Sequence, residues 1–180
     1  AEVVAQDSPV GGGAGIGYSG HKHQKGEKTL NINDNSGNVI APCVVASVNV
    51  QDTKLLPDSL NALSNIAVKL KINLKEIPIT FDSGFYSQIN DEIIYKLGMI
   101  PVIKPNHRKT KNFAIIAARE DFFKELEPLY KQRHSIERTF AWEDVYRKLV
   151  IRYERLQSTF LGFRYLAYTM INYRSEFGKT

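Results

Sequence analysis

The sequence predicts an α/β fold in which helices flank a mixed β-sheet, with a long helix near the C-terminus. Residues 77–82 are a short apolar run, and residues 28–33 alternate apolar and polar side chains, so both read as strands. Between them, residues 54–70 carry apolar side chains at helical spacing. Three strand patterns are followed by alternating helix and strand patterns up to residue 142, which favours a mixed sheet flanked by helices.

Composition sets broad limits on what the protein can be. The 180 residues suffice for one domain with a core, and 43% hydrophobic and 24% charged residues are ordinary for a globular protein. We therefore expect a single domain over residues 1–180. The longest apolar stretches are too short to span a bilayer, so no membrane association is expected. The net charge of +5 is compatible with a polyanionic partner. A single cysteine, Cys43, rules out an internal disulfide and favours a cytoplasmic protein.

The N-terminal half reads as three strands. Residues 2–6 form the first, residues 28–33 the second, and residues 39–49 the third, with a turn at 35–38 joining the last two into a hairpin. The Gly-rich segment 11–17 is expected to be a loop. It is not a phosphate-binding P-loop, because no Gly-Lys-Ser/Thr follows it.

The C-terminal half alternates helices and strands. After the helix 54–70 and the strand 77–82, we expect a helix at 91–97 and a strand at 99–103. The polar segment 104–112 is a loop, and residues 122–142 are helical, with Pro128 as a candidate break. The final amphipathic helix is predicted to pack through Leu149, Tyr153, Leu156, Phe160, Phe163, Ala167 and Met170.

Asp82 is the first candidate for chemistry. It ends the apolar strand and is followed by Ser83 and Gly84, and open α/β sheets place their sites at such strand ends. A carboxylate delivered there suits a metal ligand. The alternative is an N-cap for the turn or helix that follows.

Tyr130, Arg133 and Glu137 are spaced as Tyr-x2-Arg-x3-Glu within the segment 122–142. On one continuous helix these residues form a single stripe that presents Glu137 as a rigidly held carboxylate. Arg133 would then orient Glu137 or meet a DNA phosphate. The alternative for Glu137 is a surface ion pair with Arg133.

These two stretches together resemble the DDE transposases of bacterial insertion sequences. More narrowly, they resemble the group in which a strand ending in Asp-x-Gly-Tyr/Phe precedes a Tyr-x2-Arg-x3-Glu-x6-Lys helix. The resemblance extends through residues 17–23 and 34–37 and through residues 149–174, so it covers nearly the whole chain. It implies an RNase H-like fold and catalysis with Mg²⁺ or Mn²⁺ held by three carboxylates.

The three catalytic and metal-binding carboxylates implied by the resemblance are Asp7, Asp82 and Glu137. Asp7 follows the first predicted strand, where the family needs an Asp. An Asp upstream of Ala1 fits the family spacing as well, and a turn cap before Pro9 is the other reading of Asp7. Asp34 is an alternative ligand, but Asp-Asn-x-Gly is typical of a turn. His21 and His23 lack the further Cys or His partners that a zinc site needs.

Basic residues cluster beside the Gly-rich loop, in the segment before the Tyr130 stretch, and at the start of the last helix, where Arg152 and Arg155 also lie. Such clusters usually form a solvated face, but beside carboxylates they would neutralise DNA phosphates. Asp144 stands where the family has Lys or Arg, and we expect Arg147 and Lys148 to replace that residue. The residues predicted to contact DNA are Tyr130, Arg133, His21, Lys22, Lys25, Lys104, Arg108, Lys109, Lys111, Arg147 and Lys148.

The resemblance thus implies a transposase catalytic core that cleaves DNA at transposon ends and transfers the strand to target DNA. Two alternatives stay open: an RNase H-like nuclease without strand transfer, and a degenerate, non-catalytic DNA-binding remnant of a transposase. The expected partner is double-stranded DNA, in the bacterial nucleoid. An N-terminal end-recognition region is expected to be absent from this chain. Transposases of this kind generally act as dimers or larger assemblies, so a homodimer is also implied, with the last helix as its surface.

Overall fold

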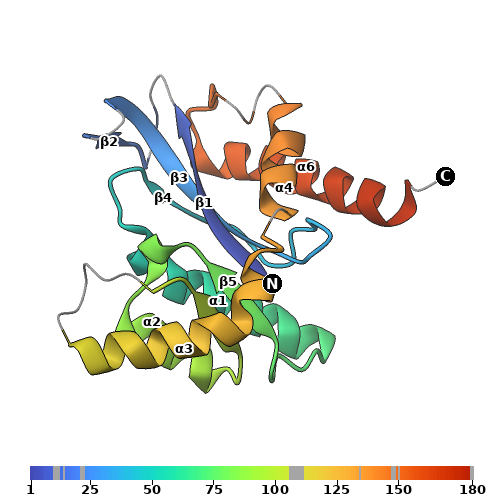
Figure 1. The fold of residues 1–180 in the computed structure, drawn as a ribbon. Coiled ribbons are helices and arrows are strands. Elements are labelled where there is room, and N and C mark those ends of the chain that lie inside the picture. The colour runs from blue at the N-terminus through green and yellow to red at the C-terminus, as the bar shows by residue number, and fades with distance from the viewer. Residues whose placement is uncertain are drawn as a thin grey trace.

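The computed structural model describes residues 1–9, 13, 15–20, 23–105, 112–133, 135–146, 149 and 151–178. Within these residues, six strands form one sheet, and helices lie on both sides of it (Figure 1). The predicted α/β fold with a mixed sheet and a long C-terminal helix is therefore confirmed.

One half of the sheet is antiparallel. β1 (Glu2–Pro9) and β3 (Gln24–Asn33) pair along their whole shared length. Two short strands, β2 (Gly17–Ser19) and β4 (Val44–Ser47), also pair with β3. The hairpin predicted from the turn at 35–38 is present, but only four residues of the predicted third strand pair as β4, and β2 was not predicted.

The other half of the sheet is parallel. β5 (Pro78–Phe81) lies beside β1, with Val3 level with Phe81, and β6 (Ile100–Ile103) lies beside β5. The strand order is β2-β3-β1-β5-β6, with β4 added on β3, which is consistent with an RNase H-like fold. This order places the end of β5, and hence Asp82, next to the central strand of the sheet.

The apolar core lies between the sheet and helix α1 (Asp52–Leu70). The apolar residues of α1 recur every three or four positions, so they form one face, and that face is buried. Leu56 and Leu60 belong to the same core cluster as Val3 and Phe81, and all four side chains are excluded from solvent. Burial of each such side chain contributes about 1.5–3 kcal/mol.

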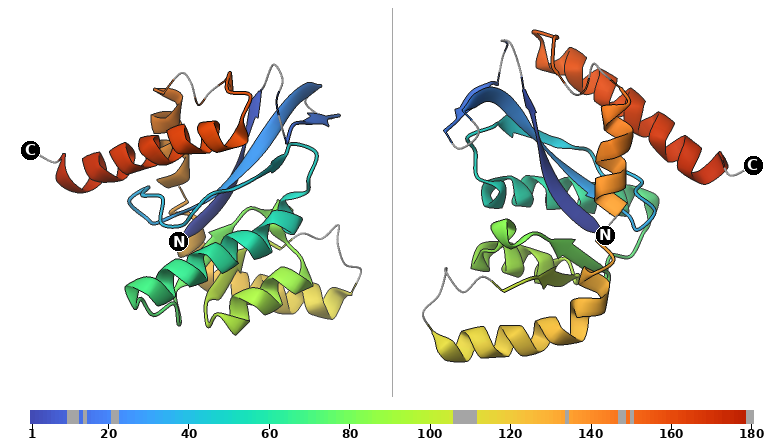
Figure 2. Two further views of the ribbon diagram at one scale, coloured as in Figure 1. Left: turned by 180° about the vertical axis from the view of Figure 1, so that it is seen from behind. Right: turned by 45° about the horizontal axis from the view of Figure 1, so that its top comes forward.

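The remaining helices divide between the two sides of the sheet (Figure 2). α2 (Gln88–Lys96) and α3 (Phe113–Tyr130) lie with α1, and both contact β6. α4 (Ser135–Asp144) packs against β1 on the opposite side, together with α6 (Gln157–Phe177). Among the described residues, none of the helices is long and apolar enough to cross a membrane.

The face of the sheet beneath α4 and α6 is polar. Glu27, Thr29, Asn31 and Asn33 alternate along β3 and are all buried, while Leu30 points to the apolar core on the other side. Buried polar groups of this kind need partners, because each unpaired one costs free energy. The helices that cover this face supply many of those partners.

The helix predicted over residues 122–142 is interrupted, which corrects the single stripe of Tyr130, Arg133 and Glu137. α3 ends at Tyr130, residues 131–133 form a turn, and α4 begins at Ser135. The physical reason lies in the packing. α3 contacts β6 on one side of the sheet and α4 contacts β1 on the other, so the chain must change direction between them.

The final helix begins later than predicted, and only part of the predicted face is buried: Leu149, Phe160 and Ala167 pack together as expected. α6 begins at Gln157, and its buried residues are Phe160, Arg164, Ala167, Tyr168 and Ile171. Tyr153 and Leu156 precede the helix and are exposed, and Phe163 and Met170 are also exposed. Arg164 and Tyr168 of α6 are buried because the face of the sheet beneath the helix is polar. The more apolar side of the helix is turned away from the sheet.

Candidate active site

Asp82 lies directly after β5, as the sequence predicted. Its backbone is still extended, and its Oδ1 accepts a hydrogen bond of 2.7 Å from the backbone N–H of Ser83, at the start of the short 3₁₀ helix η1 (Ser83–Phe85). Asp82 is therefore a cap, and its side chain is also exposed to solvent. A cap of this kind uses one carboxylate oxygen, which is compatible with a cation on the other.

Glu137 lies in the first turn of α4 and is exposed. Two buried residues further along α4 fix the helix against β3. The Nδ2 of Asn33 donates to the Oγ1 of Thr139 at 2.7 Å, and this hydroxyl donates to the carbonyl of Gly37 at 2.7 Å. One turn later, the Nδ2 of Asn31 donates to Glu143 at 3.2 Å. Glu137 is thus carried by a helix whose position is fixed by buried polar contacts.

Arg164 completes this network from α6. Its Nη1 donates to Glu143 at 3.0 Å and to the hydroxyl of Tyr168 at 3.0 Å, and its Nη2 donates to the hydroxyl of Ser8 at 2.7 Å. Burial raises the pKa of Glu143 despite the nearby charge of Arg164. The network ties α4, α6, β1 and β3 together, so it determines where α4 lies.

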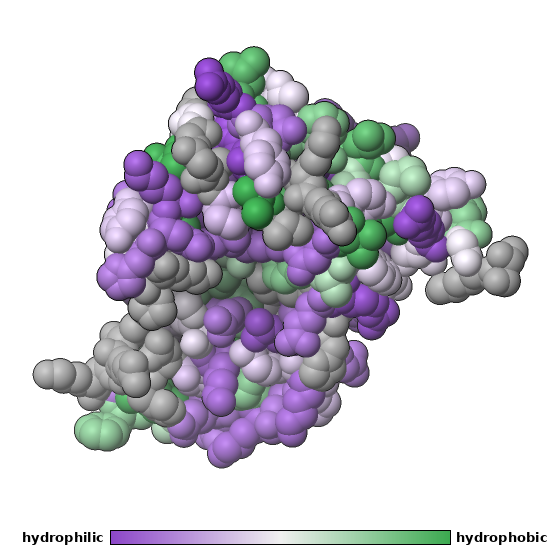
Figure 3. All heavy atoms as spheres, turned by 90° about the horizontal axis from the view of Figure 1, so that it is seen from above, coloured by the Kyte–Doolittle hydropathy of each residue, from purple (hydrophilic) through white to green (hydrophobic). Residues whose placement is uncertain are grey.

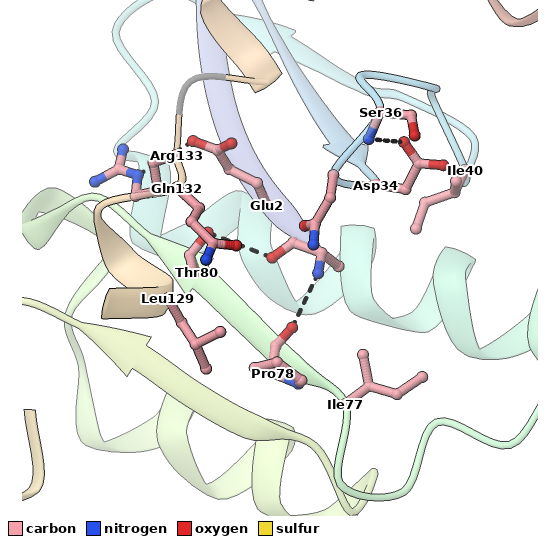
Figure 4. A pocket seen from close by; sticks show the side chains of 12 residues that line it. Glu2, Asp34, Ser36, Ile40, Ile77, Pro78, Thr80, Leu129, Gln132 and Arg133 are labelled. Carbon is pink, nitrogen blue, oxygen red and sulfur yellow. Dashed lines mark hydrogen bonds and ion pairs between the residues drawn. The ribbon is translucent and has the colours of Figure 1, made fainter. Parts of the chain in front are cut away.

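Arg133 connects the turn before α4 to β1. Its Nε donates to the Oε1 of Glu2 at 3.2 Å, and Figure 4 labels both residues. Its Nη1 donates to the hydroxyl of Tyr130 at 2.5 Å. Glu2 is buried and lies level with Thr80 of β5. In this structure Arg133 therefore pairs with Glu2, and Tyr130 supports Arg133. Contact of Tyr130 and Arg133 with DNA stays a prediction.

Asp7 lies within β1, opposite Lys28 of β3. The pairing between β1 and β5 ends at Val3 and Phe81. Asp7 lies four residues past this point along β1, whereas Asp82 lies one residue past it along β5. The offset corresponds to roughly 10 Å along the strands. Because side chains alternate along a strand, Asp7 lies on the same face of β1 as Val3. On this side of the sheet, the Nζ of Lys28 forms an ion pair with the Oδ1 of Asp52 at 2.6 Å. Asp7 as a ligand stays a prediction.

Asp34 performs the turn role that its sequence context favours. Its Oδ1 accepts hydrogen bonds from the backbone N–H groups of Ser36 and Asn38, at 2.8 and 2.9 Å. A cavity of about 460 Å³ lies between this turn, Glu2 and Arg133 (Figure 4). Because Pro78 and Ile77 also line it, the cavity lies at the amino end of β5, opposite the end that carries Asp82.

A family model described as the transposase DDE domain matches residues 79–174. The chain belongs to the transposase DDE domain family. The match covers more than half of the 180 residues and contains both Asp82 and Glu137. No curated protein and no solved structure matches the chain. The narrower group with the Tyr-x2-Arg-x3-Glu signature stays a prediction.

The carboxylates of this DDE domain have the chemistry that a divalent ion requires, since Mg²⁺ and Mn²⁺ prefer hard oxygen ligands. Among the described residues, no three His, Cys, Asp or Glu side chains lie close enough together to hold a metal ion. The assignment of Asp7, Asp82 and Glu137 therefore stays a prediction.

Only part of the predicted DNA-binding set of the DDE domain lies in the described residues. Lys25 on β3 and Lys104, directly after β6, are both exposed. Arg152, grouped in the sequence with the basic start of the last helix, is instead buried and pairs with Glu27 at 2.5 Å, so it offers no charge to DNA. The predicted contacts that lie outside the described residues are His21, Lys22, Arg108, Lys109, Lys111, Arg147 and Lys148.

Glu2 is the site residue that sequence reasoning missed. It is a buried carboxylate on β1, on the face that α4 covers, and it holds Arg133 four residues before Glu137. The available signal was the alternation of polar residues at Glu2, Gln6 and Ser8, which indicates that this face of the strand is not apolar.

Proposed function

We propose that this transposase DDE domain cleaves DNA phosphodiester bonds at transposon ends and joins the exposed 3′ hydroxyl to target DNA. The family match carries the proposal, because its span contains two exposed carboxylates on the elements that the DDE signature predicts. Asp82 follows the strand β5, and Glu137 lies on the helix α4.

The proposed chemistry is two in-line displacements at phosphorus. In the first, the oxygen of water bonds to phosphorus and the 3′ oxygen leaves. In the second, that 3′ hydroxyl attacks a target phosphate and displaces the target's own 3′ oxygen. Both transition states carry extra negative charge on oxygen, and bound Mg²⁺ or Mn²⁺ would activate the attacking oxygen and stabilise the leaving one.

Asp82 and Glu137 would hold the cation, with Asp7 as the predicted third carboxylate. The Glu143–Arg164 network and the Glu2–Arg133 pair position α4, and hence Glu137, relative to the sheet. Lys25 and Lys104 are exposed cations that would bind DNA phosphates. The Glu143–Arg164 network beneath α4 supports the role of Glu137 as a metal ligand, because such a ligand must be held rigidly.

Two assays with matched variants test the proposal. Nicking of supercoiled plasmid in Mg²⁺ or Mn²⁺, and joining of oligonucleotide duplexes with free 3′ hydroxyl ends to that plasmid, are measured for the wild type, Asp82→Asn and Glu137→Gln. The controls are Asp58→Asn and Glu125→Gln, which alter exposed carboxylates on α1 and α3. We expect both activities to fall at least a hundredfold in the site variants and to persist in the controls.

The same assays separate the alternatives. Nicking without joining would favour an RNase H-like nuclease. A wild-type chain that binds DNA but neither nicks nor joins it would favour the non-catalytic remnant. Full activity in Asp82→Asn would contradict the assigned site.

A further inference from the structure

Asn90 is a polar side chain at a position where an apolar one is expected. Hydrophilic side chains are common on the face of the molecule that Figure 3 shows, and asparagine is mostly found on such surfaces. Asn90 is instead only 1% exposed. It lies four residues before Ile94, on the same side of α2, and Ile94 belongs to the apolar core. Asparagine is also a weak helix former, so its presence here needs a reason.

The side chain of Asn90 donates hydrogen bonds to two elements outside α2. Its Nδ2 donates to the carbonyl oxygen of Phe85 at 2.9 Å and to the carbonyl oxygen of Thr53 at 3.3 Å. Phe85 ends the short helix η1, and Thr53 lies in the first turn of α1. Asn90 therefore joins η1, α1 and α2 at one point.

Pro57 explains why the carbonyl of Thr53 needs a donor from outside its own helix. In an α-helix this carbonyl would accept a hydrogen bond from the backbone N–H of the residue four positions later. That residue is Pro57, which lies inside α1 and has no N–H. The Nδ2 of Asn90 supplies the hydrogen bond that Pro57 cannot. The proline thus leaves a carbonyl open at the start of α1, and α2 binds to it.

On the other side, this link reaches Asp82 through η1. The backbone N–H of Phe85 donates to the carbonyl of Asp82 at 3.0 Å. The side chain of Phe85 is buried and packs against Phe81, with ring centroids 6.1 Å apart. Phe85 is therefore held at its N–H, its side chain and, through Asn90, its carbonyl. The turn that these contacts fix is the one that carries Asp82.

The start of α1 is in turn fixed to the sheet beside Asp7. The Nζ of Lys28 donates to the Oδ1 of Asp52, in the first turn of α1, at 2.6 Å. Lys28 lies opposite Asp7 in the pairing of β3 with β1. A continuous set of contacts therefore runs from η1 through α2 to the start of α1, and from there to β3.

We propose that Asn90 is a positioning residue for Asp82. Through the carbonyls of Phe85 and Thr53, it fixes the turn that carries Asp82 relative to the start of α1. The inference rests on the proposed function, in which Asp82 holds a divalent cation. Because Asn90 is buried, it acts through the backbone of η1 and not by contact with DNA. Loss of a residue that positions a metal ligand typically weakens metal binding about 10–100-fold.

Mg²⁺ titration calorimetry on the wild type, Asn90→Leu and Asn172→Leu tests this role. Leucine is similar in size to asparagine but cannot donate a hydrogen bond. Asn172 is the matched control, because its side chain also makes two hydrogen bonds to the backbone, both to Val39 and both 2.9 Å long. Val39 pairs with Asn33, which lies at the amino end of β1, opposite the end near Asp82.

We expect the dissociation constant for Mg²⁺ to rise roughly tenfold in Asn90→Leu and to stay unchanged in Asn172→Leu. Circular dichroism checks that both variants are folded. Asn90→Ala is the second variant, because the smaller side chain lets water reach the two carbonyls, and the same rise is expected. In metal-free protein, hydrogen exchange of the Phe85 amide should become severalfold faster in Asn90→Leu, because this amide donates to Asp82.

Pro57→Ala separates positioning from stability. Alanine at this position restores the N–H that the carbonyl of Thr53 lacks inside α1. Added to Asn90→Leu, it should recover part of the lost melting temperature. The affinity for Mg²⁺ should stay low, because the link between Phe85 and α1 is still broken. Recovery of the affinity together with the melting temperature would show that Asn90 contributes stability alone, and would overturn the proposal.

The failure of this inference is distinguishable from the failure of the proposed function. If the wild type binds Mg²⁺ and nicks DNA, unchanged Mg²⁺ affinity in Asn90→Leu would overturn the role of Asn90 alone. Unchanged hydrogen exchange at Phe85 in this variant would overturn it without reference to a metal. A wild type that neither binds Mg²⁺ nor nicks DNA would overturn the proposed function, and the role of Asn90 with it.

Discussion

Arg164 and Glu143 form a buried ion pair of 3.0 Å between α6 and α4, with both side chains almost fully excluded from water. Ser8, Asn31 and Tyr168 supply further hydrogen bonds to the same pair. Desolvating two charges is costly, so the pair is not a source of stability by itself. Its consequence is positional, because a shift of α4 would separate two buried charges.

Replacing Arg164 by methionine should therefore destabilise the protein strongly. The variant leaves the carboxylate of Glu143 buried without its cation, and loss of one partner of a buried pair costs about 3–5 kcal/mol. Urea unfolding followed by circular dichroism measures the change. Arg155→Met, at an exposed arginine just before α6, should alter the free energy of unfolding by less than about 0.5 kcal/mol. Equal effects of the two substitutions would mean that the network does not fix α4.

The stability of the domain should depend on pH through Asp91. Burial raises the pKa of Asp91 from 3.8 to about 6. A carboxyl group whose pKa is higher in the folded protein than in the unfolded chain favours folding when it is protonated. The stability that protonated Asp91 contributes is therefore fully present below pH 3.8 and is lost as the pH rises through about 6.

Asp91→Asn should remove this dependence. Above about pH 6 the variant should be more stable than the wild type, by about 1 kcal/mol once partial solvent exposure and the cation of Arg119 at 3.9 Å are allowed for. The difference should shrink toward about pH 4. Free energies of unfolding across this range measure it, and a difference that is constant with pH would refute the assignment.

The two acidic residues of β1 should behave differently. Glu2→Gln removes the charge that holds Arg133, so the free energy of unfolding should fall by about 1–3 kcal/mol. If Asp7 is the third metal ligand, Asp7→Asn should weaken Mg²⁺ binding at least tenfold. Unchanged Mg²⁺ affinity in Asp7→Asn would remove Asp7 from the site.

The exposed lysines should make DNA binding salt-dependent. A substitution that removes one lysine–phosphate interaction should reduce the slope of log K against log [salt] by about 0.9. We therefore expect Lys25→Ala and Lys104→Ala each to lower the slope for duplex DNA, measured by fluorescence anisotropy. Lys69→Ala, at an exposed position near the end of α1, should leave the slope unchanged. A slope that is the same in all three variants would exclude Lys25 and Lys104 from the DNA interface.

The sequence predicted those features that depend on local pattern. The periodicity of Leu56, Leu60 and Leu63 identified α1, and the apolar run before Asp82 identified β5. The break between Tyr130 and Ser135 was missed, because it results from α3 and α4 packing on different sides of the sheet.

The burial of Arg152 and Arg164 could not be predicted for a related reason. A charged residue on an amphipathic helix normally marks the solvent side. Here Glu27 and Glu143, distant in sequence, provide the partners that make burial of the two arginines tolerable. The role of Glu2 in holding Arg133 likewise depends on a contact between residues far apart in the sequence, which no local pattern encodes.

Mg²⁺ binding by titration calorimetry tests the central claim most directly, with the wild type compared with Asp82→Asn, Glu137→Gln and the control Asp58→Asn. We expect the wild type and Asp58→Asn to bind Mg²⁺ with the same affinity, and each site variant to bind at least tenfold more weakly. Unchanged binding in both Asp82→Asn and Glu137→Gln would contradict the assignment of these carboxylates as the metal ligands of the DDE domain.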